Sequence, residues 1–179
     1  MLSWKNYIES ARFEFKRYKT MGDKTLSQVS EEDIHWSVNE SDNSIAIIIK
    51  HLTGNMRSRW THFLTEDGEK EWRNREAEFT EPPKSKVELI ACWNAGWECL
   101  FTALHQINSS NFDTIIKIRN EEHTIVEAVN RQLAHYASHV GQLVLIGKML
   151  KGSKWVSLSI PKGASEAFNQ GKKDPTDSV

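Results

Sequence analysis

Apolar residues recur at steps of three and four through most of this 179-residue chain. That spacing lines one face of an α-helix, so it predicts amphipathic helices that pack against a shared core. Polar stretches, glycines and prolines interrupt the pattern and mark the connections. We therefore predict four long helices, at residues 4–22, 44–64, 85–107 and 124–150.

Local signals indicate where these helices begin and end. Gly22 is expected to end the first helix, because glycine commonly follows the last helical residue. Either Asn43 or Ser44 can cap the second helix. The third and fourth helices each open with a capping box, a Ser or Thr followed three residues later by Glu. These pairs are Ser85 with Glu88 and Thr124 with Glu127.

The segments outside the helices follow other patterns. Residues 65–83 are charged and end in a proline pair, which predicts a long ordered loop with some helical turn. Residues 114–119 alternate apolar and polar positions, which predicts a short strand and, with a turn at 120–122, a small hairpin. After Gly152 no helical period remains, so we expect an extended tail that is mobile from about residue 171 to 179.

The full pattern predicts an all-α protein: a four-helix bundle with a small β-hairpin before the last long helix and an extended C-terminal tail. A chain of 179 residues has the size of one domain. We assign residues 1–170 to that domain.

Composition and charge argue against several classes of protein. The formal net charge is −1 and the basic residues are scattered, so a nucleic-acid partner is not expected. The longest apolar run, 45–49, is five residues, far short of the roughly 20 that cross a bilayer. The N-terminal residues lack the apolar core of a secretory signal, which favours a cytoplasmic protein without a membrane partner. Cys92 and Cys99 are too far apart for a CxxC motif and are interpreted as buried free thiols.

The strongest candidate chemistry lies in the last long helix, where His135 and His139 are four residues apart. One helical turn separates them, so both imidazoles leave the same face and can reach one metal ion. His51 falls on the apolar face of the second helix and is the best candidate for a third ligand. Three imidazoles would leave coordination positions open for water or substrate, as in catalytic metal sites. The alternative is that the three are unrelated histidines satisfied by hydrogen bonds.

Other kinds of site find less support. There is no HExxH helix, no paired ExxH motif, no phosphate-binding glycine loop and no GxSxG elbow. The remaining histidines lack a partner at ligand spacing, although His62 lies about three turns after His51 and stays open as a ligand. These residues are His35, His62, His105 and His123.

Two segments resemble the paired motifs of the DinB/YfiT-like superfamily of metal-binding four-helix bundles. They are NSIAIIIKHLTGNMRSRW, which contains His51, and LAHYASHVGQLVLIGKML, which contains His135 and His139. The loop DGEKEWRNREAEF and the tail WVSLSIPKGASEAFN further resemble a bacterial subfamily of unknown function. The resemblance covers nearly the whole chain.

This resemblance implies a bundle whose second and fourth helices meet around a divalent metal, with zinc or nickel the best candidates. It also implies a homodimer. Characterised relatives use low-molecular-weight thiols, as S-transferases or isomerases, and others are presumed hydrolases. The shared residues are the metal ligands alone, so the resemblance transfers no substrate-binding residue.

We carry two hypotheses from the sequence. The first is a metal-dependent enzyme that activates a thiol cofactor or water, with a small-molecule substrate. In it, nearby amides would orient the imidazoles; the alternative is that they make ordinary helix-surface or interhelical hydrogen bonds. Arg73 and Arg75 could meet an anionic substrate, with solvated charge or a dimer contact as the favoured alternative. The second is a non-catalytic metal-binding, dimerising bundle. The amides in question are Asn55, Gln132 and Gln142.

Overall fold

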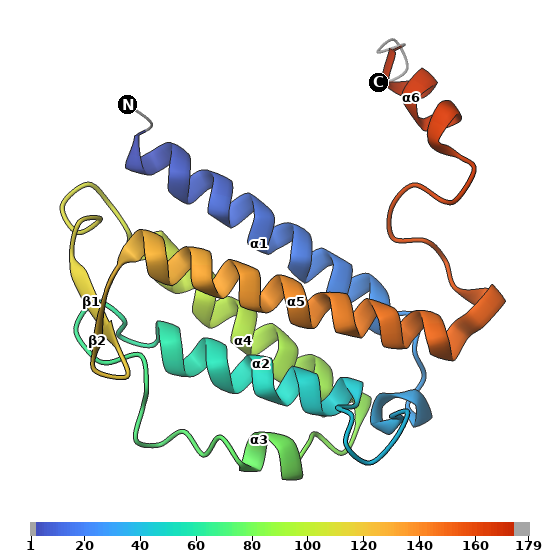
Figure 1. Ribbon diagram of the computed structural model, residues 1–179, viewed down its shortest axis with the longest axis horizontal. Helices are drawn as coiled ribbons and strands as arrows, with labels where there is room; N and C mark the ends of the chain where they lie inside the picture. The colour runs from blue at the N-terminus through green and yellow to red at the C-terminus, as the bar shows by residue number, and fades with distance from the viewer. Residues whose placement is uncertain (1–2, 174–179) are drawn as a thin grey trace.

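The computed structural model describes residues 3–173 of the chain. It is mostly helical, with four long helices that run alongside one another and a small two-stranded antiparallel sheet at one end (Figure 1). The long helices pack mainly as two pairs, α1 on α5 and α2 on α4. The long helices are α1 (Trp4–Leu26), α2 (Ile45–Trp60), α4 (Lys86–Gln106) and α5 (Ile125–Lys151). The short elements are η1 (Glu32–His35), α3 (Ala77–Thr80), β1 (Ile115–Ile118), β2 (Glu121–Thr124), η2 (Gly152–Lys154) and α6 (Ser165–Lys173).

Side-chain caps begin the long helices where the sequence places them. The Ser44 hydroxyl accepts a hydrogen bond from the Ile47 amide, which resolves the cap of α2 in favour of Ser44. At α5 the capping box is complete, because Thr124 accepts from the Glu127 amide while the Glu127 carboxylate accepts from the Thr124 amide.

The capping box predicted for α4 is only half formed. Ser85 accepts from the Glu88 amide at 3.2 Å, as a capping serine does. The Glu88 carboxylate, however, accepts from the Lys84 amide at 2.8 Å rather than from that of Ser85. The start of α4 is still at the predicted place.

Two predicted helix ends are wrong. The first helix continues through Gly22 to Leu26, and Gly22 is instead a packing residue: a Cβ there would lie 2.2 Å from Cζ2 of Trp93. Helix α2 ends at Trp60, four residues before the predicted 64. The backbone becomes extended at Thr61 and takes a positive φ of 49° at His62, so the helix cannot continue.

The predicted hairpin is present, with its turn shifted by one residue. Arg119 and Asn120 both have positive φ, 58° and 62°, as the two central residues of a type I′ turn require. The 65–83 loop is tied to this hairpin, because the Gly68 amide donates to the Lys117 carbonyl and the Asp67 carboxylate accepts from the amides of Arg119 and Asn120. The hairpin therefore fixes the start of the loop that crosses the face of α2.

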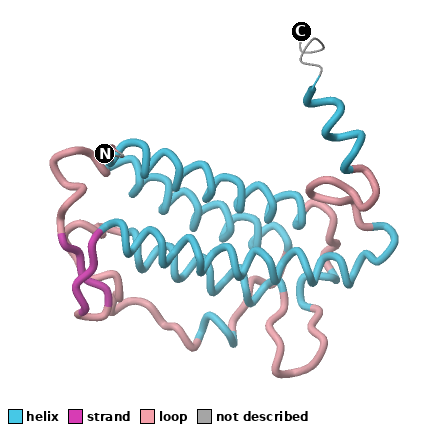
Figure 2. Tube along the Cα trace, turned by 45° about the horizontal axis from the view of Figure 1, so that its top comes forward, coloured by secondary structure: helices cyan, strands magenta, loops and turns pink. Residues whose placement is uncertain are grey.

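The segment after Gly152 differs from the extended tail that we predicted, because it contains helix α6 (Figure 2). Good helix formers in SEAFNQGKK, including Glu166 and Ala167, explain the helix without any long apolar period. The proposed boundary at residue 170 falls within α6, and residues 174–179, part of the predicted mobile end, lie outside the described residues. No helix in the described part of the chain is long and apolar enough to cross a membrane.

Four large aromatic side chains fill the middle of the core. Trp93 and Trp97 come from α4, Phe15 from α1 and Tyr136 from α5, and each is at most 1% exposed. Their rings contact one another with centroids 5.3 to 6.4 Å apart. Tyr136 follows His135 directly, so this packing also fixes the helix that carries the histidine pair.

Candidate metal centre

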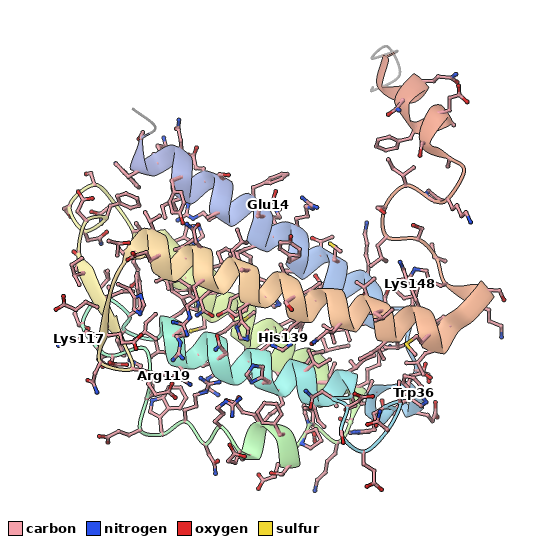
Figure 3. The ribbon with its side chains drawn as sticks, viewed as in Figure 1. Glu14, Trp36, Lys117, Arg119, His139 and Lys148 are labelled. Atoms are coloured by element: carbon pink, nitrogen blue, oxygen red, sulfur yellow. The ribbon has the colours of Figure 1, made fainter. Side chains whose placement is uncertain are left out.

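Three histidines converge between α2 and α5. His51 projects from α2 and His135 and His139 from α5; Figure 3 shows His139 between these two helices. One nitrogen from each ring can be chosen so that all three lie within 4.8 Å of one another. The Nε2 atom of His135 is 3.4 Å from that of His51 and 3.1 Å from that of His139.

These separations fit the ligands of one divalent ion. Bonds of about 2.05 Å at tetrahedral angles place neighbouring ligand nitrogens about 3.3 Å apart. Among the described residues, no fourth histidine, cysteine or carboxylate belongs to the group. The protein can therefore offer three nitrogen ligands, and further positions would remain for a small molecule.

His51 is oriented by a buried carboxylate. Its Nδ1 lies 2.9 Å from Oε2 of Glu78, a residue of the short helix α3 that is only 3% exposed. Arg73 holds the same carboxylate with two hydrogen bonds, of 2.7 and 3.0 Å. An ionised carboxylate only accepts hydrogen bonds, so Nδ1 of His51 carries the proton and Nε2 presents its lone pair to the other imidazoles.

The ionised state of Glu78 follows from its surroundings. Burial alone would raise the pKa of this carboxyl, but hydrogen bonds from His51 and Arg73 outweigh burial and hold the pKa below its usual value. Helix α2 leaves room for the carboxylate at Gly54, where a Cβ would lie 2.1 Å from Glu78 Oε1. Sequence reasoning missed Glu78, because nothing in its local pattern distinguishes it from the other acidic residues of the loop.

Gln142 has the same role for His139. Its side-chain oxygen accepts from Nδ1 of His139 at 2.8 Å, so Nε2 of that ring also presents a lone pair. Two lone pairs then face Nε2 of His135, whose single proton can satisfy only one of them. This donor set is better satisfied by a cation than by hydrogen bonds among the three rings.

The protonation states agree with that arrangement. Burial, together with the smaller effects of the neighbouring His139 and His51, lowers the pKa of His135 to about 4. Burial also lowers the pKa of His139, partly offset by its hydrogen bond to Gln142. Both rings are neutral at pH 7, the form in which imidazole binds a metal.

Asn55 and Gln132, the other two predicted orienting amides, lie beside the centre but do not hydrogen-bond to an imidazole. Asn55 accepts from the Tyr136 hydroxyl at 3.0 Å, and that hydroxyl accepts from the Trp60 indole at 3.1 Å. Gln132 is 2% exposed, and its side-chain oxygen has no hydrogen-bond partner within the described residues.

A cavity of about 390 Å³ opens above the three histidines. Arg73, one of the two arginines considered as substrate contacts, is bound to Glu78, whereas Arg75 lies over the Phe79 ring at 5.1 Å with 51% of its side chain exposed. None of the lining residues is acidic. The side chains around the histidines are Asn55, Arg59, Arg73, Arg75, Phe79, Arg119, Arg131 and Gln132.

Residues 3–164 match a family described as "Protein of unknown function (DUF1572)". The match spans most of the sequence. The chain belongs to this family. The three histidines, Glu78 and Gln142 all lie within the DUF1572 match. No curated protein and no solved structure gives a significant match to the chain.

The remaining histidines do not join the centre of this DUF1572 protein. His62, the one left open from the sequence, is exposed beyond the end of α2, and the shortened helix removes it from the face that carries His51. His105 is exposed on α4, where its Nδ1 lies 2.7 Å from the Phe101 carbonyl oxygen. His35 is exposed, and His123 is half-buried in β2.

Proposed function

We propose that this protein is a metal-dependent enzyme in which His51, His135 and His139 bind a divalent ion, zinc or nickel. Its reaction would use either a low-molecular-weight thiol, as an S-transferase, or water, as a hydrolase. The observation that carries the proposal is the convergence of three imidazole nitrogens at the floor of an open cavity.

The fold belongs to the same proposal. The four long helices would form a bundle of the DinB/YfiT-like type, in which the second and last long helices supply the ligands. The placement of His51 on α2 and of the pair on α5 supports this assignment. We also propose the homodimer that the resemblance implies.

A bound divalent ion lowers the pKa of a coordinated water or thiol, which supplies a nucleophile at neutral pH. Other residues of the chain orient the ligand imidazoles for that chemistry. Glu78 and Gln142 hold two imidazoles with their Nε2 atoms directed inward. Arg73 keeps Glu78 ionised, so this carboxylate accepts a hydrogen bond from Nδ1 of His51.

Two features favour turnover over a purely structural metal. A structural site usually has four protein ligands, whereas only three converge among the described residues. The cavity above the histidines also gives a small molecule access to the centre. A metal that only braced α2 against α5 would need neither feature.

The test is elemental analysis of protein purified without an affinity tag, followed by thiol-transferase and hydrolase assays of the metal-loaded form. We expect about one zinc or nickel per chain in the wild type and none in His135→Ala. The matched control is His105→Ala, because His105 is exposed on α4 and outside the centre. Circular dichroism should show the same helical content in all three.

The outcomes separate the hypotheses. Metal bound by the wild type and by His105→Ala but not by His135→Ala, together with turnover, supports the enzyme. Metal with the same dependence on His135 but no turnover in either class of assay supports the non-catalytic alternative. No retained metal in the wild type, or equal retention in His135→Ala, contradicts the proposed centre.

A further inference from the structure

Positive charge is concentrated around the candidate centre, although the chain as a whole has a formal net charge of −1. The cavity lining includes five arginines and no acidic residue. The arginines come from four separate parts of the chain: α2, the loop before α3, the hairpin turn and α5. They are Arg59, Arg73, Arg75, Arg119 and Arg131.

Nearby carboxylates neutralise only part of this charge. Glu69 pairs with Arg59 at 3.2 Å and with Arg119 at 2.8 Å, and it lies 3.8 Å from Arg73. Glu78 takes the two strong bonds of Arg73. Arg59 and Arg73 are buried and form ion pairs with carboxylates of the 65–83 loop, so they are poorly placed to bind a substrate.

Arg75 and Arg131 remain as cationic groups that a ligand can reach, and Arg119 is also exposed although it pairs with Glu69. The side chains of Arg75 and Arg119 are 51% and 52% exposed. Arg75 is paired only with Glu76, at 3.6 Å and itself 86% exposed, a contact that water screens strongly. Arg131 is exposed on α5 and has no ion pair within the described residues. Because it lies four residues before His135, its side chain leaves the helix on the same face as the two histidines.

Two buried polar atoms on the cavity residues lack partners. They are Nε of Arg59 and the side-chain oxygen of Gln132, each with no hydrogen-bond partner in the described part of the chain. Buried polar groups are normally satisfied, so these atoms leave hydrogen-bonding capacity beside the cavity. Of the two, only Nε of Arg59 is a donor that an anion can use.

We infer that this cavity binds an anionic small molecule, whose carboxylate or phosphate group contacts Arg75, Arg119 and Arg131 while its reacting group lies against the three histidines. This inference rests on the proposed function, since it names the substrate class of the same centre. Guanidinium groups bind planar and tetrahedral anions through paired hydrogen bonds, and three of them around one opening select for negative charge. A neutral thiol or ester would leave Arg131 without a counter-charge and Arg75 with only its exposed contact to Glu76.

The test measures anion binding by the metal-free protein, so that direct coordination of the anion by a metal does not contribute. Isothermal titration calorimetry is performed with two probes, succinate for carboxylates and inorganic phosphate for phosphates. The variant is Arg75→Gln/Arg131→Gln, which removes two of the three exposed arginines and keeps Arg119, the one paired with Glu69. The matched control is Arg17→Gln/Lys148→Gln, which removes the same charge from a second basic cavity between α1 and α5.

We expect saturable binding of at least one probe, weakened about tenfold or more in Arg75→Gln/Arg131→Gln and unchanged in the control, because each charge-assisted hydrogen bond contributes strongly to affinity. The affinity should fall as salt is added. The probe that binds more tightly identifies the acidic group. Absence of saturable binding of both probes, or a loss confined to the control, overturns the inference.

Metal retention keeps this failure distinct from failure of the proposed function. Neither Arg75 nor Arg131 hydrogen-bonds to an imidazole, so the double variant should retain as much zinc or nickel as the wild type. Retained metal without anion binding would support the metal centre and contradict only the inference of an anionic substrate. Anion binding by a protein that does not retain metal would support the anionic ligand and contradict the metal centre.

Discussion

Glu78 is the residue on which the geometry of His51 most depends. It accepts from Nδ1 of His51 and from two nitrogens of Arg73, and it is almost fully buried. A ligand imidazole that donates its other N–H to a carboxylate is held in one tautomer and becomes more basic. Glu78 is therefore a positioning residue, which acts on the metal through His51.

We predict that Glu78→Gln weakens zinc affinity by about 10–100-fold, as is typical when such a partner is lost. The amide is similar in shape but lacks the charge that Arg73 and His51 share. Competition with a chromophoric chelator measures the change. Glu76→Gln is the control, since the Glu76 side chain is 86% exposed and, within the described residues, pairs only with Arg75. Equal zinc affinity in the two variants would show that the carboxylate does not support the centre.

A second prediction concerns the pH dependence of stability in the metal-free protein. Burial holds the pKa of His135 at about 4, below the ordinary value of 6.5. Between these values the unfolded chain binds more protons than the folded one, so stability rises with pH across this window and is lost as pH falls from about 6.5 to about 4. The lowered pKa of His139 acts in the same direction.

Urea denaturation of metal-free protein at about pH 7 and about pH 5 tests this dependence. The stability of His135→Gln should fall less between the two conditions than that of the wild type, because one titrating group has been removed. An equally steep loss in His135→Gln would mean that other groups control the acid sensitivity.

At the scale of elements, α1 and α4 approach closely at Gly22. The Trp93 indole occupies the space that a side chain at residue 22 would need, and its Nε1 donates to Asp23 at 2.7 Å. The indole is packed in the core and cannot move aside easily. A glycine that resembles a helix stop in the sequence is therefore an interhelical contact in the structure.

We predict that Gly22→Ala destabilises the protein by about 1–3 kcal/mol, the usual cost of overpacking a core. The matched control is Gly141→Ala in α5, where a Cβ would meet nothing within 4 Å. That substitution should stabilise by roughly 0.5–1 kcal/mol, because alanine favours a helix over glycine. Chemical denaturation gives both values, and a stabilising Gly22→Ala would contradict the close packing.

At the scale of the molecule, the candidate centre links two helices that are not each other's main packing partners. The long helices pack mainly as α1 with α5 and α2 with α4, whereas the histidines join α2 to α5. A metal bound there would connect the two pairs. Its binding energy would add to the stability of the folded chain, because the unfolded chain has no assembled site.

We therefore predict that zinc at about 100 times its Kd raises the melting temperature by roughly 5–10 °C, and that a chelator reverses the rise. Differential scanning calorimetry measures it. In His139→Ala the rise should be largely absent, and in His62→Ala it should be retained, because His62 is exposed and outside the centre. A rise of equal size in both variants would place the zinc elsewhere.

The sequence alone determined what depends on neighbours along the chain. Helical spacing predicted the long helices, capping residues predicted the starts of α2, α4 and α5, and the four-residue step placed His135 beside His139. These features are local, because a helix fixes the positions of residues three and four apart. The placement of His51 near the pair was a hypothesis that needed the fold, since 84 residues separate it from His135.

The tertiary structure decided the contacts between distant segments. It placed Trp93 against Gly22, ended α2 before His62, brought Glu78 to His51 and gathered arginines from four parts of the chain around one cavity. The physical reason is the same in each case. Such contacts depend on how whole helices pack and how loops cross them, and the spacing of residues within a single segment carries no information about a partner in another.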